Sequence, residues 1–236
     1  MSGGGTSGTV IFRGTALRQV GRQNAVGPAV LETPLEVHTP LVGVFNVSNT
    51  LTALGMGLGL GLEPEGMVKA VADFGGVPGR MQPVNAGQDF AVLVDYAHTP
   101  DSVRNLLVTA QSFTSGRVIS VIGCGGDRDK GKRPLMGREA EKESDVVIVT
   151  SDNPRSEEPS EIIAQIVAGL ERPGAALVQP DRRLAIRAAV HEAQPGDSVL
   201  ILGKGHESGQ EFATHTVPFD DRQVAREALE ELLGKR

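Results

Sequence analysis

Residues 145–155 have the sequence Asp-Val-Val-Ile-Val-Thr-Ser-Asp-Asn-Pro-Arg, an apolar run that ends in a polar loop. The run Asp145–Thr150 is rich in Val and Ile, as is typical of a strand buried on both faces of a parallel sheet. The polar segment Ser151–Arg155 follows this strand directly. Ligands of open α/β sheets bind at the loops that follow the strands, so Ser151–Arg155 is a candidate ligand-binding loop.

The side chains of this loop suit recognition of an amino acid. Arg155 offers a planar fork of donors that can bind a carboxylate with two parallel hydrogen bonds. Asn153 can donate and accept at once, as the zwitterionic end of an amino acid requires. Pro154 restricts the backbone of the loop. An ordinary polar turn before a helix uses the same residue types, so the segment alone leaves both interpretations open.

The alternation of apolar runs and amphipathic segments continues from about residue 90 to the C-terminus. The predicted strands are Phe90–Asp95, Arg117–Gly123, Asp145–Thr150, Ala175–Gln179 and Ser198–Leu202. The predicted helices are Pro100–Phe113, Arg133–Lys142, Pro159–Leu170, Asp181–Glu192 and Asp221–Leu233. Thr99, Asp181 and Asp220 are typical residues for helix starts. This order predicts an α/β fold, a Rossmann-like, mostly parallel sheet with helices on both faces.

Residues 1–76 have a different pattern. Two short strand candidates, Val10–Arg13 and Leu35–His38, precede two predicted helices, Ser48–Leu62 and Pro64–Phe74. The first of these helices is rich in glycine, so packing rather than helix propensity must stabilise it. Gly75–Arg80 combines Gly with Pro and is predicted to link two domains, residues 1–76 and 77–236.

The bulk composition limits the class of protein. The chain has 236 residues, of which 39% are hydrophobic, enough for one large domain or one domain and part of another. The net charge is −6 and no basic stripe occurs, so nucleic acid is not an expected partner. A single cysteine excludes an intrachain disulfide and fits a reducing, cytoplasmic location. The sequence contains no signal peptide and no apolar run of the roughly 18 residues that a membrane span needs.

Unusual polar sequences follow four of the five predicted strands. They are Asp95–Pro100, Gly123–Pro134, Ser151–Arg155 and Gly203–Glu207. In an open parallel sheet these loops share one edge, which predicts a ligand site there. A purely structural sheet needs none of this chemistry in its loops.

Individual residues in these loops have two possible roles. Glu207 can hold an ammonium group while a backbone group of Gly203 makes a second contact, although a surface helix start would have a similar sequence. His98 beside Asp95 fits an acid–base pair or a hydrogen-bonded loop anchor equally well. Cys124 lies among glycines and is expected to be a buried filler rather than a nucleophile. No Cys/His spacing of a metal site occurs, and no residue is a certain catalytic group.

Gly126–Lys132 has the spacing of the phosphate-binding motif G-x-x-x-x-G-K. The next residue is Arg133, where that motif needs the hydroxyl of Ser or Thr for Mg²⁺. Asp127 and Asp129 would also set carboxylates against phosphate oxygens. The sequence therefore argues against a phosphate loop. Two other roles fit better: Arg128 binds a substrate carboxylate, or the Lys and Arg residues belong to a solvent-exposed turn.

Taken together, these motifs resemble the Mur ligase family, most closely its diaminopimelate-adding members. The resemblance covers the chain from about Leu41 to the C-terminus. The segments that carry it are Gly43–Asn49, Gly76–Met81, Asp95–Asp101, Gly125–Pro134, Asp152–Arg155 and Gly203–Glu207.

The resemblance implies two groups of binding residues. The residues expected to help bind ATP are Asn49, Arg80, Asp95 and His98. The residues expected to bind the incoming diamino acid are Arg128, Asp152, Asn153, Pro154, Arg155, Gly203 and Glu207. In this family Asp-Asn-Pro-Arg is associated with meso-diaminopimelate, which has a second carboxylate that lysine lacks. An arginine built for that group is left unpaired by lysine, at a cost of about 1–3 kcal/mol.

The resemblance also implies a reaction. The amine of meso-diaminopimelate would attack an acyl phosphate formed from ATP on UDP-MurNAc-L-Ala-D-Glu, with Mg²⁺ present. Residues 1–76 would be the end of a central ATPase domain and residues 77–236 the C-terminal, acceptor-binding domain. The family's phosphate loop and Mg²⁺ ligands are not visible in this sequence. Because the charge on the phosphate must be neutralised during the reaction, this chain alone is expected to be inactive.

Two other functions stay open at this point. One is a non-catalytic module that binds an amino acid or a muropeptide-like ligand, which the missing phosphate loop favours. The other is a related amide ligase of the lysine-adding or folylpolyglutamate type, against which Arg155 argues.

Overall fold

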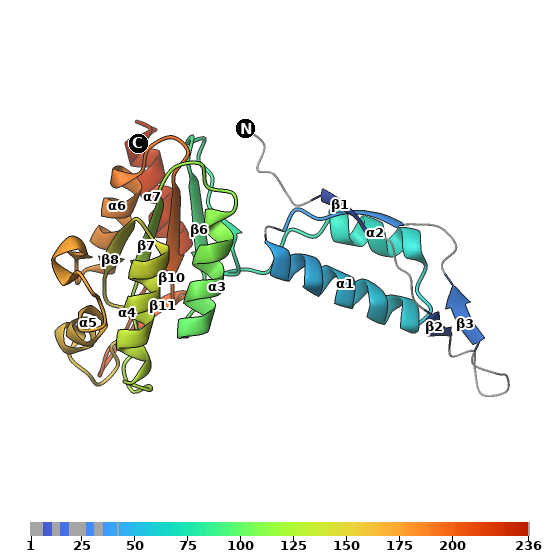
Figure 1. Cartoon of the computed structure of the whole chain (residues 1–236). Coiled ribbons are helices and arrows are strands. Elements are labelled where there is room, and N and C mark those ends of the chain that lie inside the picture. The colour runs from blue at the N-terminus through green and yellow to red at the C-terminus, as the bar shows by residue number, and fades with distance from the viewer. Residues whose placement is uncertain (1–6, 11–14, 19–26, 31–34, 42, 236) are drawn as a thin grey trace. The chain divides into compact units, whose positions relative to one another are not determined.

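The computed structural model describes residues 7–10, 15–18, 27–30, 35–41 and 43–235 (Figure 1). The chain divides into two compact units, Met1–Gly76 and Val77–Arg236.

The first unit consists of two short antiparallel ladders and two helices. Strand β1 (Ser7–Val10) pairs with β4 (Leu35–His38), and β2 (Thr15–Arg18) pairs with β3 (Gly27–Val30). Helices α1 (Val44–Gly59) and α2 (Pro64–Ala72) contact each other. The predicted strand Leu35–His38 and both predicted helices are confirmed, although α1 begins four residues earlier than expected. Of the strand candidate Val10–Arg13, only Val10 lies within the described residues, at the end of β1.

The second unit is built on a six-stranded sheet with the order β5-β6-β10-β7-β8-β9. Its strands are β5 (Gln82–Pro83), β6 (Ala91–Asp95), β7 (Val118–Ile122), β8 (Val146–Val149), β9 (Leu177–Val178) and β10 (Ser198–Leu202). All neighbours are parallel except β5, which pairs antiparallel with β6. The predicted mostly parallel sheet is therefore confirmed. The two-residue strand β5 was not predicted.

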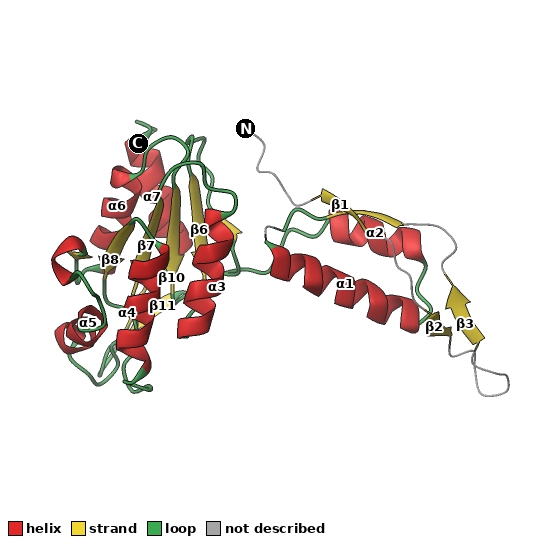
Figure 2. Ribbon diagram, in the orientation of Figure 1, coloured by secondary structure: helices red, strands yellow, loops and turns green. Residues whose placement is uncertain are grey.

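Helices cover both faces of this sheet, as the sequence predicts (Figure 2). Helices α3 (Pro100–Gln111), α4 (Lys132–Glu143) and α5 (Pro159–Val167) pack side by side on one face. Helices α6 (Arg182–Glu192) and α7 (Asp221–Leu232) pack together on the other. The central strands are covered from both sides, and Val94, Ile119 and Ile201 are completely buried. This double burial explains why the strands are continuous apolar runs.

Three of these helices begin at the polar side chains expected from the sequence. Thr99 caps α3 by accepting a hydrogen bond from Ser102 N at 3.2 Å. Asp181 and Asp220 cap α6 and α7 in the same way. Each cap satisfies backbone amides that a helix start leaves unpaired, and it fixes the point at which the preceding loop ends.

A small hairpin follows β10. It consists of β11 (Gly209–Glu211) and β12 (Thr216–Pro218), which pair antiparallel. An isolated parallel bridge joins Arg155 to Phe212 next to this hairpin. The hairpin was not predicted, and it supports the candidate site.

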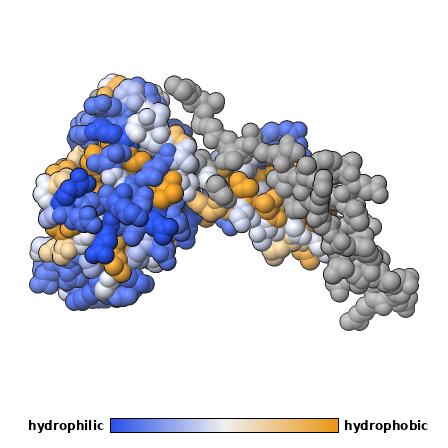
Figure 3. All heavy atoms as spheres, viewed as in Figure 1, coloured by the Kyte–Doolittle hydropathy of each residue, from blue (hydrophilic) through white to orange (hydrophobic). Residues whose placement is uncertain are grey.

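Exposed apolar side chains occur on α1 and just after it. Met56 and Leu60 are 65% and 80% exposed, and the orange patch on this helix in Figure 3 contrasts with the largely hydrophilic visible face of the second unit. Within the described ranges, no helix combines the length and the apolar character that crossing a membrane requires.

Candidate functional site

The loops after β6, β7, β8 and β10 surround a cavity of about 330 Å³ at the carboxyl edge of the sheet. The residues expected to bind ligand that line it are His98, Arg128, Asp152, Asn153, Arg155, Gly203 and Glu207. The structure thus brings together side chains that are more than 100 positions apart in the sequence. The volume is sufficient for a small ligand of amino-acid size.

Close backbone packing positions the loop Asp152–Arg155. Gly126 N donates a hydrogen bond to Asn153 O at 2.8 Å. A Cβ atom at Gly126 would overlap the carbonyl of Pro154, so only glycine allows this approach. The glycines after β7 therefore serve the neighbouring loop, which explains why this stretch resembles a phosphate loop without acting as one.

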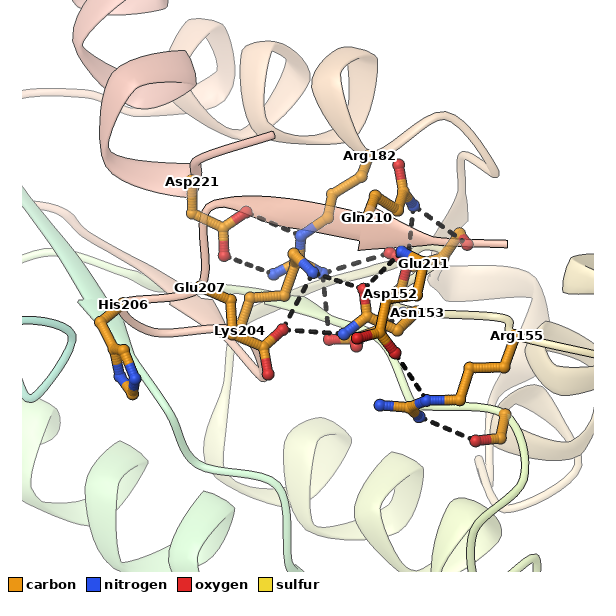
Figure 4. A network of polar contacts seen from close by, with 12 residues as sticks. Asp152, Asn153, Arg155, Arg182, Lys204, His206, Glu207, Gln210, Glu211 and Asp221 are labelled. Carbon is orange, nitrogen blue, oxygen red and sulfur yellow. Dashed lines mark hydrogen bonds and ion pairs between the residues drawn. The ribbon is translucent and has the colours of Figure 1, made fainter. Parts of the chain in front are cut away.

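Asn153 is the centre of a buried polar network (Figure 4). Its Oδ1 accepts hydrogen bonds from Lys204 Nζ at 2.6 Å and from Glu211 N at 3.1 Å. Its Nδ2 donates to Glu207 Oε2 at 2.8 Å. The sequence suggested that Asn153 would both donate to a ligand and accept from it. The structure differs, because the acceptor atom already has two partners and only the second N–H of the amide is left for a ligand.

Lys204 is the residue of this network that the sequence analysis missed. Its side chain is 0% exposed, and its Nζ also lies 3.1 Å from Glu207 Oε2. Gly203 and Gly205 flank it with φ angles of 115° and 55°. These left-handed turns fold Lys204 inward, and they depend on glycine. A lysine between two glycines directly after the apolar run Val199–Leu202 is the feature that could have marked it.

A second buried cluster lies beneath the loop. Arg182 donates from Nε to Asp221 Oδ1 at 2.8 Å and from Nη2 to Asp221 Oδ2 at 2.7 Å. Both side chains are 0% exposed. Arg182 Nη1 also donates to Ser151 O and lies 3.9 Å from Asp152 Oδ2. The pair comes from the starts of α6 and α7 and had no detectable pattern in the sequence.

The formal charges of these two clusters do not balance. Two cations, Arg182 and Lys204, face three carboxylates, which belong to Asp152, Glu207 and Asp221. One negative charge is therefore left over at this end of the cavity. Glu207 is 30% exposed and lines the cavity, so a cationic group of a ligand placed next to it would be favoured.

Arg155 lies at the other end of the loop. Its Nε contacts Glu211 Oε2 at 2.8 Å, and its Nη1 donates to Gly126 O at 2.8 Å. Its side chain is 23% exposed and lines the cavity. Within the described part of the chain, Nη2 has no hydrogen-bond partner, so Arg155 keeps donors for an anionic group.

The segment that resembles a phosphate loop uses its own amides. Gly131 N donates to Asp129 Oδ1 at 2.9 Å, and Arg133 N donates to Lys130 O at 3.2 Å. These amides at the start of α4 are the groups that would otherwise hold a phosphate. Arg128 is exposed, and its Nη1 donates to Asp127 O at 3.1 Å. The geometry agrees with the sequence-based argument against a phosphate loop.

Arg133, which follows this segment, is a buried anchor. Its side chain is 1% exposed, and it donates from Nη1 and Nη2 to the two oxygens of Glu157, each at 2.9 Å. These bonds, followed by those from Asp127 N and Lys130, hold the pKa of Glu157 well below its usual range. The pair ties the loop after β7 to the start of α5.

The second unit holds three of the four residues expected to bind ATP. They gather around the single tyrosine of the chain, Tyr96. Arg80 Cζ lies 5.0 Å from the centroid of this ring, and the ring of His98 lies 4.7 Å from it. His206, which the sequence analysis did not select, packs against the same ring at 5.6 Å. Asn49 belongs to α1 of the first unit, where its side chain is exposed and donates to Asn46 Oδ1 at 3.4 Å.

Asp95 is buried, and its two carboxylate oxygens accept from Met81 N and Ala97 N, both at 2.7 Å. Burial raises the pKa of Asp95, and these two hydrogen bonds oppose the shift. The Nδ1 atom of His98 lies 2.8 Å from Tyr96 O. This contact favours the loop-anchor role of His98 over an acid–base pair with Asp95.

Cys124 is buried against Met136, with 3.6 Å between the two sulfur atoms. Burial raises the pKa of its thiol to about 12, so it is not a nucleophile at neutral pH. Among the described residues, no group of three or more His, Cys, Asp or Glu side chains is arranged to hold a metal ion.

Comparison with known proteins defines the class. The family profile described as the Mur ligase, glutamate ligase domain matches residues 79–205, which is more than half of the chain. The chain belongs to the Mur ligase family.

Its relatives include UDP-N-acetylmuramoyl-L-alanyl-D-glutamate–2,6-diaminopimelate ligases. The enzyme of Thermosynechococcus vestitus is 52% identical over 217 residues, which are 90% of this chain and 44% of the relative. The enzyme of Synechocystis sp. is 53% identical over 193 residues, which are 81% of this chain and 38% of the relative. The chain thus spans less than half the length of these relatives.

Solved structures agree with this assignment. A structure of a ligase of that same name superposes with a TM-score of 0.66 at 40% identity, covering 87% of this chain and 42% of the other. The UDP-N-acetylmuramate–alanine ligase of Thermotoga maritima gives 0.59 at 21% identity, covering 86% and 41%. The second similarity concerns the fold alone.

Proposed function

We propose that this chain is the acceptor-binding part of an ATP-dependent amide ligase of peptidoglycan synthesis. The ligase adds meso-diaminopimelate to UDP-MurNAc-L-Ala-D-Glu in the cytoplasm and so contributes to cell shape and division. Residues 77–236 form the acceptor-binding domain in this proposal, and residues 1–76 are the end of a central ATPase domain. The names of relatives that are 52% and 53% identical support it.

One observation carries the proposal. The cavity combines excess negative charge around Glu207 with unused donors on Arg155. A diamino acid with an ammonium group at one end and a carboxylate at the other matches both. Lysine matches only the first, because it has no distal carboxylate.

Each residue expected to bind the diamino acid has a role in this proposal. Glu207 and Asp152 attract the ammonium group, and Asn153 donates its second N–H to the ligand. Arg155 binds the distal carboxylate. Arg128 and Gly203 also line the cavity and bind the remaining polar groups, and Pro154 restrains the backbone of the loop. The bound amine then displaces phosphate from the acyl phosphate, so that a C–N bond forms, a C–O bond breaks and the amine loses a proton.

The residues around Tyr96 are proposed to bind ATP together with Asn49. A guanidinium group over an aromatic ring suits phosphate and base, so Arg80 and Tyr96 fit a nucleotide. Asp95 acts mainly by fixing the backbone near Arg80, since both of its oxygens already accept from backbone amides. Among the described residues no group of three or more His, Cys, Asp or Glu side chains is arranged to hold a metal ion, so no step is assigned to Mg²⁺.

Calorimetric titration of the 236-residue chain with meso-diaminopimelate and with L-lysine tests the function. We expect meso-diaminopimelate to bind roughly 5- to 150-fold more tightly, because an unpaired arginine costs about 1–3 kcal/mol. An exposed arginine outside the site, changed as Arg172→Ala, is the control and should preserve this ratio. Equal affinities, or no binding of either ligand, would contradict the proposal.

A further inference from the structure

Strand β11 fixes the backbone of Arg155. Arg155 N donates to Glu211 O at 3.0 Å, and Arg155 forms an isolated parallel bridge with Phe212. The φ angle of Arg155 is 51°, in the left-handed region that is uncommon for residues other than glycine. The contacts with β11 stabilise this conformation, in which the side chain lines the cavity.

Glu211 also determines which donors of Arg155 stay available. Its Oε2 forms an ion pair with Nε of Arg155 at 2.8 Å, and Gly126 O accepts one hydrogen of Nη1. Among the described residues Nη2 has no partner, and Figure 4 shows it without a dashed contact. A guanidinium group has five N–H donors in one plane. The side edge at Nε is therefore occupied, whereas the end edge formed by Nη1 and Nη2 can still bind a carboxylate.

Glu211 is itself held on the candidate ligand-binding loop. Its backbone N donates to Asn153 Oδ1 at 3.1 Å, and the preceding Gln210 donates from Nε2 to Asp152 O at 2.7 Å. The Glu211 side chain is 49% exposed. An isolated ion pair at that exposure contributes little to stability, which leaves positioning as the more substantial role of this contact.

We propose that Glu211 is a positioning residue that sets the preference for ligands with a distal carboxylate. The inference rests on the proposed function and deepens it. Glu211 holds the Nε edge of Arg155, so that the ligand carboxylate binds end-on at Nη1 and Nη2, beside Glu211 rather than in its place. Lysine has no distal carboxylate, so it makes no contact of this kind with Arg155.

Glu211 could instead compete with the ligand for Arg155, and this role predicts the opposite change in binding affinity. If the carboxylate of Glu211 competed with the ligand for Arg155, its removal would strengthen the binding of meso-diaminopimelate. If Glu211 positions Arg155, its removal weakens that binding. The two roles are therefore separated by the direction of one measured change.

The experiment is calorimetric titration of the 236-residue chain with meso-diaminopimelate and with L-lysine. We expect Glu211→Ala to weaken the binding of meso-diaminopimelate about tenfold and to leave lysine binding unchanged. Glu211→Gln should restore only part of the affinity, because it keeps the length of the side chain but removes the charge that pairs with Nε. In an Arg155→Ala background, Glu211→Ala should have no further effect.

Three outcomes would overturn the inference. The first is tighter binding of meso-diaminopimelate by Glu211→Ala. The second is an equal loss of affinity for both ligands in this variant. The third is that Glu211→Ala weakens binding as much in the Arg155→Ala background as in the unaltered chain. Glu171→Ala, an exposed glutamate outside the site, is the matched control, and thermal melting of each variant tests folding. If the unaltered chain does not distinguish meso-diaminopimelate from lysine, the proposed function itself fails.

Discussion

Two arginine–carboxylate pairs flank the loop Asp152–Arg155, and they differ in burial and in what they leave unpaired. Arg182 and Asp221 are both 0% exposed, and every guanidinium nitrogen of Arg182 contacts an acceptor of the chain. Arg155 and Glu211 are 23% and 49% exposed, and Nη2 of Arg155 has no partner among the described residues. The first pair is complete without a ligand, whereas the second is not.

This difference separates framework from recognition. A buried ion pair fully satisfied by the chain holds backbone segments together, and removing one partner leaves a buried charge. A half-exposed pair contributes little to stability, but it can orient the donors that remain. We therefore expect changes at Arg182 or Asp221 to affect folding, and changes at Arg155 to affect ligand choice.

The largest expected effect is on stability. Asp221→Ala should lower the free energy of unfolding by about 3–5 kcal/mol, because it leaves Nε and Nη2 of the buried Arg182 without their carboxylate partner. Urea denaturation of the chain measures the change. The matched control is Asp101→Ala, which removes an exposed acid from the first turn of α3 and should cost about 0.3–1 kcal/mol. Equal losses in the free energy of unfolding at the two positions would contradict the framework role of the Arg182–Asp221 pair.

The second effect is on binding. Arg155→Ala should weaken the binding of meso-diaminopimelate by about 1–3 kcal/mol and leave lysine binding unchanged, as calorimetry would show. Alanine is the better substitution for this test, because it keeps the Cβ that Arg155 already has at a φ of 51°, whereas glycine would also relieve backbone strain. The free energy of unfolding should change by less than for Asp221→Ala. Parallel losses for both ligands would indicate a framework role for Arg155 too.

The fold was largely predictable because double burial has a simple signature. The run Ser198–Leu202 coincides with β10, since both faces of this strand are covered and every residue is apolar or small. The prediction was poorest at Ala175–Gln179, of which only Leu177–Val178 forms a strand. The 3₁₀ turn Pro173–Ala175 replaces its start, and β9 is an edge strand whose two residues stay exposed.

The site was predictable only in outline. Parallel topology brings the four polar loops to one edge, so the cavity follows from the order of the strands. The partners of each charge do not follow in this way. Lys204 meets Asn153 from 51 positions away, and Arg182 meets Asp221 from 39 positions away. No local pattern encodes such pairs, and Arg182 has the sequence context of an ordinary helix start.

A third pair, Arg133 and Glu157, lies between the two extremes, at 1% and 12% exposure, and its effect depends on pH. Since the folded pKa of Glu157 is lowered, its stabilisation is present above the ordinary value of 4.5 and is lost as the pH falls below it. Glu157→Gln should therefore lower the melting temperature at pH 7, and the difference from the unaltered chain should shrink in acid. Glu161→Gln, on the exposed first turn of α5, should not show this convergence.

The smallest effect is expected at the surface. Arg187 and Glu231 form an ion pair of 2.6 Å between α6 and α7, with 41% and 45% exposure. Arg187→Ala should change the free energy of unfolding by no more than about 1 kcal/mol, because water and salt screen exposed charges. Urea denaturation at low and high salt measures this, and the small loss should vanish in high salt. A cost similar to that of Asp221→Ala would show that exposure does not separate framework pairs from the others, and the distinction drawn for Arg155 would lose its physical basis.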